Sequence, residues 1–483
     1  MQRARLTWSP TPTMILSMPI PHDIIDYIIQ NFALDIATLK ACSLASRAFV
    51  TPTRKVLFAV VSLIPARCAK LSALLLANRH LSDCIREIYI VVPQSTRQPF
   101  QPDSVRRHTK ALEIILNSLS PSHLRLLSMM FGDKTHRYSW GKLSAALRTA
   151  IERVFQLPSL ETLNFIGVEK LPYGLFGHLS QTKSVILLSV GIDTTGFETK
   201  DNPAHHQASW GATPYQRRRC SLEKLEVSYH FEDEPLRLAA LRCTLDLSHL
   251  HSMTVLVEKT NPDDAWWILQ DSLQSLDTFT MYCYFYTYSV PEQEHFNLAA
   301  FAKLRIMRIV TDTTEEGDAP LRWLSHVLTR LASSTNDKAV PLEELTLHID
   351  MMEEPDSDIW TTTSLVWADI DKVLTSPPFA KLHKVSVYIC NPPSASSLLR
   401  CGFHSWHVED IIKYLAPSLH AKKILEARPT CLNLEDILKG AEETFVQDDP
   451  DDSDSEDQWD DYYDSEDDDD DSGDDSDEDE YVP

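Results

Sequence analysis

The stretch that decides the fold reads LEELTL over residues 342–347, with apolar side chains at its first, fourth and sixth positions. The fourth and sixth residues alternate with other residues, so on a β-strand they face the same side of a sheet. The first residue turns in from the preceding loop. We call this pattern the frame and number its positions from its first apolar residue.

The frame recurs ten times, with starting positions separated by 22 to 40 residues. The apolar triplets are Ile85/Ile88/Ile90, Leu124/Leu127/Met129, Leu160/Leu163/Phe165, Thr182/Val185/Leu187, Leu222/Leu225/Val227, Leu250/Met253/Val255, Leu276/Phe279/Met281, Leu304/Met307/Ile309, Leu342/Leu345/Leu347 and Leu382/Val385/Val387. Helix-like stretches separate them, for example residues 111–119, 142–155, 265–273, 321–331 and 367–374. A unit of one strand and one helix cannot close its own core, so we expect the units to stack on one another in an α/β fold.

The amino end has a different period. Ile24, Ile25, Ile28, Ile29 and Phe32 recur at helical spacing, which gives one apolar face. A second helix is expected over residues 36–44, and a third from the Thr51-Pro52 pair to about residue 58. Three short helices bury little surface, so we expect either a cap on the larger domain or a module that docks on a partner.

The residues of this helical segment resemble an F-box, the module that attaches substrate receptors to the Skp-type linker of cullin–RING ubiquitin ligases. The family opens with Leu-Pro-x-Glu, where this chain has IPHD at 20–23, and continues with Cys/Val-Ser-Leu-Val, where it has CSLA at 42–45. The resemblance implies a linker-protein interface made by Ile20, Pro21, Ile24, Ile28 and Leu44. It covers roughly a tenth of the chain.

The frames resemble the irregular leucine-rich repeats that follow the F-box in many fungal-type receptors. Half of the intervals exceed the usual repeat of 20–29 residues, and the usual Asn/Cys position mostly holds another residue. This departure leaves open a non-repetitive α/β domain with ten apolar strands. The expected organisation is a disordered leader (1–17), an F-box-like helical module (18–60), a leucine-rich-repeat-like solenoid of strand–helix units (61–445) and a disordered acidic tail (446–483).

The acidity of the chain belongs to its tail. The formal charge is −25 over 483 residues, and 22 Asp and Glu lie between residues 448 and 480 without a Lys or Arg, so the remainder carries only −3. This argues against a direct nucleic-acid surface, which would need clustered positive charge. The composition of the tail suits a solubilising extension or a segment that binds basic partners such as histones.

The other residue motifs in the sequence do not indicate catalysis, and we expect no cofactor and no metal. Glycine is scarce, with 12 residues, and no phosphate-binding glycine motif is present. The nine cysteines never form C-x-x-C, which predicts reduced thiols in the cytoplasm or the nucleus, and no apolar run approaches the ~18 residues that a membrane span requires. His404 and His407 with Asp410 have a spacing that chance often produces.

The resemblance implies a non-catalytic substrate receptor of an SCF-type ubiquitin ligase, in which the repeats hold an unknown protein target. The expected target-binding residues occupy positions 3, 5 and 7 of the late frames: Thr278, Thr280, Tyr282, Arg308, Glu344, His348, Lys384 and Tyr388. Two other hypotheses are an interaction scaffold without ligase association and a nuclear factor that binds basic proteins through its tail. An unrecognised hydrolase would require several ionisable side chains in one cleft.

Overall fold

The fold is described from a computed structural model. It covers residues 20–33, 35–92, 102–132, 137–193, 220–229, 241–242, 244–258, 269–284, 300–312, 319–334, 339–350, 357–390 and 408–430. The expected leader and the acidic tail lie outside these residues.

One parallel β-sheet dominates the described part of the chain, where it has 12 strands in the order β1-β2-β3-β5-β8-β11-β13-β14-β15-β16-β17-β18. The strands are β1 (Val60–Leu63), β2 (Glu87–Val91), β3 (Leu126–Met130), β5 (Thr162–Ile166), β8 (Ser184–Leu188), β11 (Lys224–Tyr229), β13 (Ser252–Glu258), β14 (Thr278–Tyr284), β15 (Ile306–Asp312), β16 (Glu344–Asp350), β17 (Lys384–Cys390) and β18 (Leu425–Thr430). Their order in the sheet follows the chain without reversal, so the expected α/β class is confirmed.

Shorter strands form small parallel pairs beside this sheet. They are β4 (Tyr138–Ser139) with β6 (Val168–Glu169), β7 (Leu171–Pro172) with β9 (Ile192–Asp193), and β10 (Cys220–Ser221) with β12 (Leu245–Asp246). Gly167, just before β6, has a positive φ of 66° and its Cα faces the backbone of Gly132, so a Cβ there would lie 2.6 Å from the Gly132 carbonyl. Only glycine suits this crossing.

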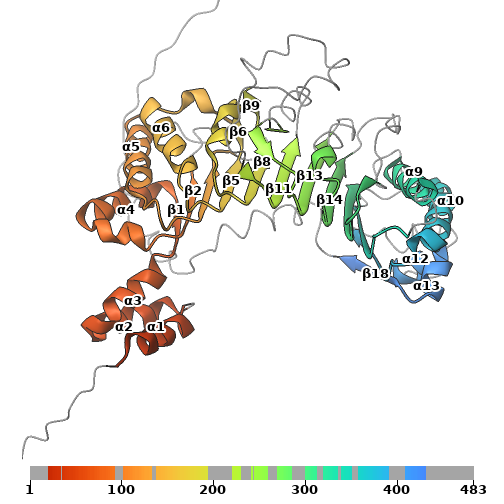
Figure 1. Cartoon of the computed structure of the whole chain (residues 1–483), viewed down its shortest axis with the longest axis horizontal. Coiled ribbons are helices and arrows are strands. Elements are labelled where there is room, and N and C mark those ends of the chain that lie inside the picture. The colour runs from red at the N-terminus through yellow and green to blue at the C-terminus, as the bar shows by residue number, and fades with distance from the viewer. Residues whose placement is uncertain are drawn as a thin grey trace, which may run out of the picture.

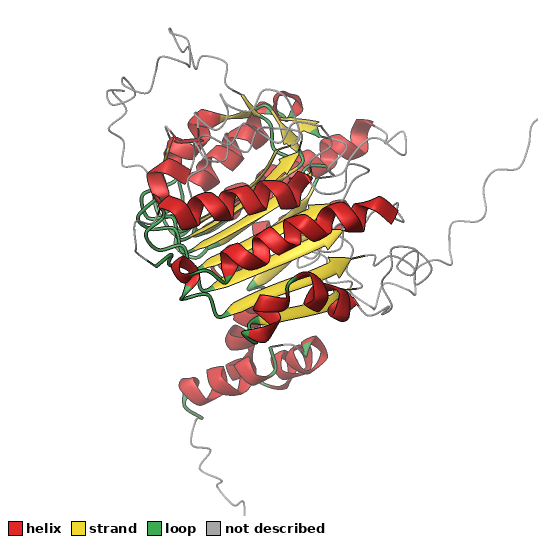
Figure 2. Cartoon of the chain, turned by 90° about the vertical axis from the view of Figure 1, so that its right-hand side faces the viewer, coloured by secondary structure: helices red, strands yellow, loops and turns green. Residues whose placement is uncertain are grey.

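Helices connect many of the strands. The α-helices are α1 (His22–Asn31), α2 (Ile36–Ala45), α3 (Arg47–Leu57), α4 (Pro65–Ala77), α5 (Pro102–Ser118), α6 (Ala145–Phe155), α9 (Ala319–Ser334), α10 (Ser357–Leu374), α12 (Val408–Leu415) and α13 (Pro417–Ala421). Short 3-10 helices are η1 (Arg79–Asp83), η2 (Trp140–Lys142), η3 (Tyr173–His178), η5 (Gln270–Ser272) and η7 (Pro377–Phe379). Figure 2 shows long helices running alongside the strands on one face of the sheet. In Figure 1, α1–α3 lie apart from the strands, next to α4 at the β1 end.

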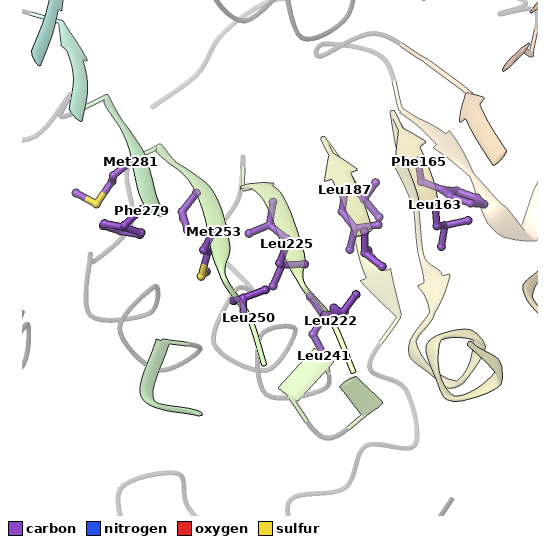
Figure 3. Packing of buried hydrophobic residues seen from close by; sticks show 14 of the residues in the cluster. Leu163, Phe165, Leu187, Leu222, Leu225, Leu241, Leu250, Met253, Phe279 and Met281 are labelled. Atoms are coloured by element: carbon purple, nitrogen blue, oxygen red, sulfur yellow. The ribbon is translucent and has the colours of Figure 1, made fainter. Parts of the chain in front are cut away.

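The main core lies between the sheet and these helices, and the frame residues build it. The side chains at positions 1, 4 and 6 of all ten frames are buried. Position 4 of each frame is the register partner of position 4 in the next, as in Leu163 with Val185 and Met307 with Leu345. Figure 3 shows part of this arrangement, from Leu163 on β5 to Phe279 on β14. The prediction that positions 4 and 6 share one face is therefore confirmed.

Neighbouring frames also join at position 2 by a repeated hydrogen-bond pair. The position-2 carbonyl accepts the backbone N–H groups of positions 2 and 3 in the next frame. One example is Asp277, whose carbonyl oxygen lies 2.9 Å from the Arg305 nitrogen and 3.0 Å from the Ile306 nitrogen. The same pair of bonds recurs from Ala59 onward to Glu343. Each unit therefore meets the next with the same backbone geometry.

The third helix begins earlier than the sequence predicted. It starts at Arg47, where the Ser46 hydroxyl accepts a hydrogen bond from the Ala48 N–H, so the prediction of a cap at Thr51 was wrong. Pro52 lies inside this helix and is buried. Because proline has no N–H, the helix lacks one internal hydrogen bond at Pro52. Ser46, and not Thr51, is the N-cap residue.

Candidate functional site

The amino-terminal helices have a small core of their own. Ile25, Ile29 and Leu39 are buried together, and Phe49 and Val56 are among the partly buried side chains that pack on them. This cluster is separate from the main core of the sheet. The helical face that Ile25 and Ile29 form is therefore used internally, between α1, α2 and α3.

The residues expected at the linker interface lie on the outside of these helices. Ile20 is 52% exposed, Ile24 is 50% exposed and Leu44 is 88% exposed. Pro21 is also exposed, and Ile28 is half-buried. Ile24 and Ile28 are one helical turn apart, so they face the same side of α1. The structure thus leaves four of these five residues exposed to solvent.

Exposed apolar side chains concentrate at this end of the molecule. Among the described residues, ten of the twelve exposed large hydrophobic side chains fall between residues 20 and 76. They are Ile20, Ile24, Tyr27, Phe32, Ile36, Leu44, Val60, Ile64, Leu74 and Leu76. Single exposed apolar residues are ordinary on a protein surface, whereas such a concentration is typical of an interaction site. The sequence pattern placed Phe32 on the apolar face of the first helix but did not single out Tyr27 or Ile36, whose exposure depends on how the three helices pack.

Few contacts that the structure describes join this helical unit to the sheet. An Arg54 guanidinium nitrogen on α3 lies 3.1 Å from Nε2 of His80 on η1. Only Phe58 and Ala59 separate the end of α3 from the first residue of β1. The unit therefore adjoins the end of the sheet, and the apolar residues outside its own core stay in solvent.

The expected target-binding residues all lie on the sheet face opposite the frame residues, which we call the second face. Register aligns them in three rows across β14 to β17. Position 3 holds Thr278, Ile306, Glu344 and Lys384; position 5 holds Thr280, Arg308, Thr346 and Ser386; position 7 holds Tyr282, Val310, His348 and Tyr388. Arg308 and Lys384 are exposed, Thr280 is buried, and the other predicted residues are half-buried.

Aromatic contacts and charge shape this face. The rings of His348 and Tyr388 stack, with centroids 4.6 Å apart and an interplanar angle of 15°. Burial, together with the positive charge of Arg308, lowers the pKa of His348 to about 4. Burial raises the pKa of Tyr282. His348 is consequently a neutral aromatic ring at physiological pH, and Tyr282 is a neutral phenol.

Position 2 of the frames carries a row of charged residues that sequence reasoning did not single out. Arg305 lies between Asp277 and Glu343, with nitrogen–oxygen distances of 3.8 and 2.7 Å, and Lys183 lies 3.0 Å from Glu223. Charges alternate in sign along much of this row, and that alternation is visible in the sequence once the frames are aligned. Exposed ion pairs of this kind add little to the free energy of unfolding. They disfavour a shifted strand register, because a shift would separate the paired charges.

Among the described residues, no group of three or more His, Cys, Asp or Glu side chains could hold a metal ion. His404 and His407 lie outside the described ranges, and Asp410 lies near the Lys413 amine on α12, at 3.5 Å. Within the same ranges, every helix is too short or too polar to cross a membrane.

Comparison with known proteins adds no assignment: no protein-family model matches this sequence, and no curated protein matches it.

Proposed function

We propose that this protein is a substrate receptor of an SCF-type ubiquitin ligase, which docks on a Skp-type linker through α1–α3 and holds its target on the sheet. The observation that carries the proposal is the exposure of Ile20, Ile24 and Leu44 on a helical unit that already has its own core. These residues match the F-box pattern by position. Their apolar area would be removed from water by a partner, at about 25 cal/mol per Å².

The strand–helix units support the second half of the proposal. Their chain-order sheet and repeated hydrogen-bond pair favour a leucine-rich-repeat-like solenoid over a non-repetitive α/β domain. A stacked array presents a long sheet face to a protein partner. A receptor of this kind performs no bond chemistry and acts by keeping its target close to the ligase.

The linker interface is tested by capture of purified Skp-type linker with the full chain. The Ile24→Asp, Leu44→Asp double variant places two charges on the exposed apolar surface without touching the Ile25 and Ile29 core. We expect capture to fall by about tenfold or more, since each lost anchor is worth about 1–3 kcal/mol. The matched control is Leu365→Asp on α10, where the side chain is 73% exposed and far along the chain.

Two results would contradict the proposal. One is absence of linker capture by the wild-type chain, and the other is equal capture by the double variant and by the Leu365→Asp control. The first result would leave the scaffold hypothesis, in which the F-box-like helices have no ligase partner.

The alternative of a basic-protein-binding factor rests on the 22 acidic residues between 448 and 480. Removing residues 447–483 separates it from the receptor hypothesis. The truncated chain retains linker capture if it is a receptor, whereas a factor that acts through the tail loses histone binding in a salt-dependent way.

A further inference from the structure

A row of apolar and aromatic side chains crosses the second face of the sheet at frame position 7. We call it the position-7 row, and its members on β13 to β17 are Leu256, Tyr282, Val310, His348 and Tyr388. Leu256 and Val310 are buried and Tyr282 packs against them, in a cluster separate from the main core. His348 stacks on Tyr388. Leu256 and Val310 are covered within the chain, so the half-buried rings of Tyr282, His348 and Tyr388 are the part of the row that solvent reaches.

Arg308 lies beside this row, at position 5 of β15, and it is exposed. Within the described part of the chain its guanidinium has no ion-pair partner, and its charge reaches both Tyr282 and His348. Other cations on this face are paired: Lys224 lies 3.4 Å from Glu226, and Lys384 lies 3.8 Å from Glu426. Arg308 is thus an uncompensated positive charge next to apolar side chains.

Two buried polar atoms near Arg308 also lack partners. Ser386 occupies position 5 of β17, two strands from Arg308 in the same row, and is 1% exposed. Its hydroxyl makes no hydrogen bond, and Nδ1 of His348 makes none either. A buried polar group without a partner costs about 1–3 kcal/mol, so these two atoms reduce the stability of this part of the sheet.

We propose that the second face binds an extended segment of a target protein, in which an Asp or Glu carboxylate pairs with Arg308 and a neighbouring apolar side chain packs on the half-buried rings of the position-7 row. This inference rests on the proposed receptor function and specifies its target class. Guanidinium and carboxylate form the strongest common charge-assisted hydrogen bonds, and the adjacent apolar surface excludes water from them.

The charge of the site favours a carboxylate over a phosphorylated residue. Phosphorylated segments are recognised by clusters of arginine, because the group carries a charge of about −1.5 to −2. Here one guanidinium stands beside an uncharged His348 ring. Glu226 and Glu344 share the same face and would repel a dianion more strongly than a monoanion.

The test uses the full-length chain and a displayed library of random dodecapeptides as the probe. We expect selected peptides to be enriched in Asp or Glu next to Leu, Phe or Tyr. Synthetic versions of a selected peptide then carry Glu, Gln or phosphoserine at the enriched position. The Glu peptide binds about tenfold or more tightly than the Gln and phosphoserine peptides if the assignment is right.

Variants assign that binding to Arg308. Arg308→Ala lowers affinity for the Glu peptide by about tenfold and leaves affinity for the Gln peptide nearly unchanged. Lys303→Ala removes the same charge from an exposed residue just before β15 and is the matched control. Recovery of no binding peptide, of peptides without acidic residues, or of binding that Arg308→Ala does not weaken would overturn the proposal. Preferred binding of the phosphoserine peptide would also overturn it.

Linker capture separates this proposal from the receptor hypothesis. The Arg308→Ala variant retains linker capture, because Arg308 lies on the second face rather than on α1–α3. Selection of acidic peptides without any linker capture would support the peptide site and contradict the receptor function. Linker capture without selection of acidic peptides would support the receptor function and contradict the peptide site.

Discussion

His348 shows at the scale of one residue how burial sets protonation. Its ring lies against Tyr388, and its Nδ1 atom is buried without a hydrogen-bond partner. Burial, with Arg308 close by, lowers the pKa of this imidazole from 6.5 to about 4. At pH 5 the His348 ring is therefore protonated in the unfolded chain but mostly neutral in the folded chain.

The sign of the pH effect follows from this difference. As pH falls below about 6.5, the unfolded state binds a proton at His348 and the folded state does not, so the free energy of unfolding decreases until about pH 4. Between pH 7 and pH 5 the loss due to His348 is about 2 kcal/mol. The His348→Phe variant keeps an aromatic ring against Tyr388 and removes this part of the pH dependence.

Urea unfolding of both proteins at pH 7 and pH 5 measures the effect. The control variant is His249→Gln, which removes the imidazole of an exposed residue. An identical loss of stability in the wild type and in His348→Phe would show that His348 does not contribute.

At the scale of elements, Asp371 shows how helices of different units are tied together. This buried carboxylate on α10 accepts the backbone N–H groups of Ser418, at 3.0 Å, and Leu419, at 2.8 Å, in the first turn of α13. It therefore caps a helix 47 residues away in sequence. The cap holds α13 against α10 beside the last strand of the sheet.

Removing this cap should destabilise the carboxy-terminal end of the fold. Asp371→Ala removes the acceptor of both N–H groups and leaves that of the buried residue Leu419 unpaired, so we expect the free energy of unfolding to fall by about 2–3 kcal/mol. Asp371→Asn keeps one acceptor oxygen and should lose less. Urea unfolding measures both, with Asp369→Ala as the control because Asp369 is exposed on the same helix. Equal stability of the Asp369→Ala and Asp371→Ala variants would contradict the role of the cap.

The elements also show what the sequence could predict. All ten frames were visible because each keeps large apolar residues at positions 4 and 6, and these side chains form the core. The strands at the two ends of the sheet were missed. Phe58, Val61 and Leu63 form an eleventh frame that is not among the ten, because its first residue, Phe58, was predicted to end the third helix; β1 pairs with β2 there. In β18 the residues aligned with the core positions of β17 include Ala427, which is buried, and Pro429, which is exposed, and neither carries a strand signal.

The candidate sites were predictable to a different degree. Alternation along a strand places Thr280, Arg308 and His348 on one face without further information, and register then aligns them. The stacking of His348 on Tyr388, and the absence of an ion pair at Arg308 among the residues that the structure describes, depend on side-chain positions across strands. The exposure of Tyr27 and Ile36 likewise follows from helix packing, which sequence periodicity does not determine.

At the scale of the whole molecule, the sheet and α1–α3 have separate cores, so we expect the free energy of local unfolding to differ between them. The main core is one continuous cluster from Leu63 to Ala427, whereas Ile25, Ile29 and Leu39 form the small core of α1–α3. A unit with so few buried side chains opens at a lower free energy than the sheet. The structure therefore favours local unfolding of α1–α3 while the sheet stays folded.

Hydrogen exchange of the full chain tests this expectation. Peptides covering α1–α3 should take up deuterium about tenfold or more faster than peptides covering β5 and β8, because exchange in the sheet requires opening of the main core. Purified Skp-type linker at about 100 times its Kd should slow exchange in α1–α3 by about 100-fold and leave β5 and β8 unchanged. Simultaneous exchange of both regions without linker would show that the two cores unfold together. Protection that spreads equally over α1–α3 and β5 would show that the linker does not bind the helices specifically.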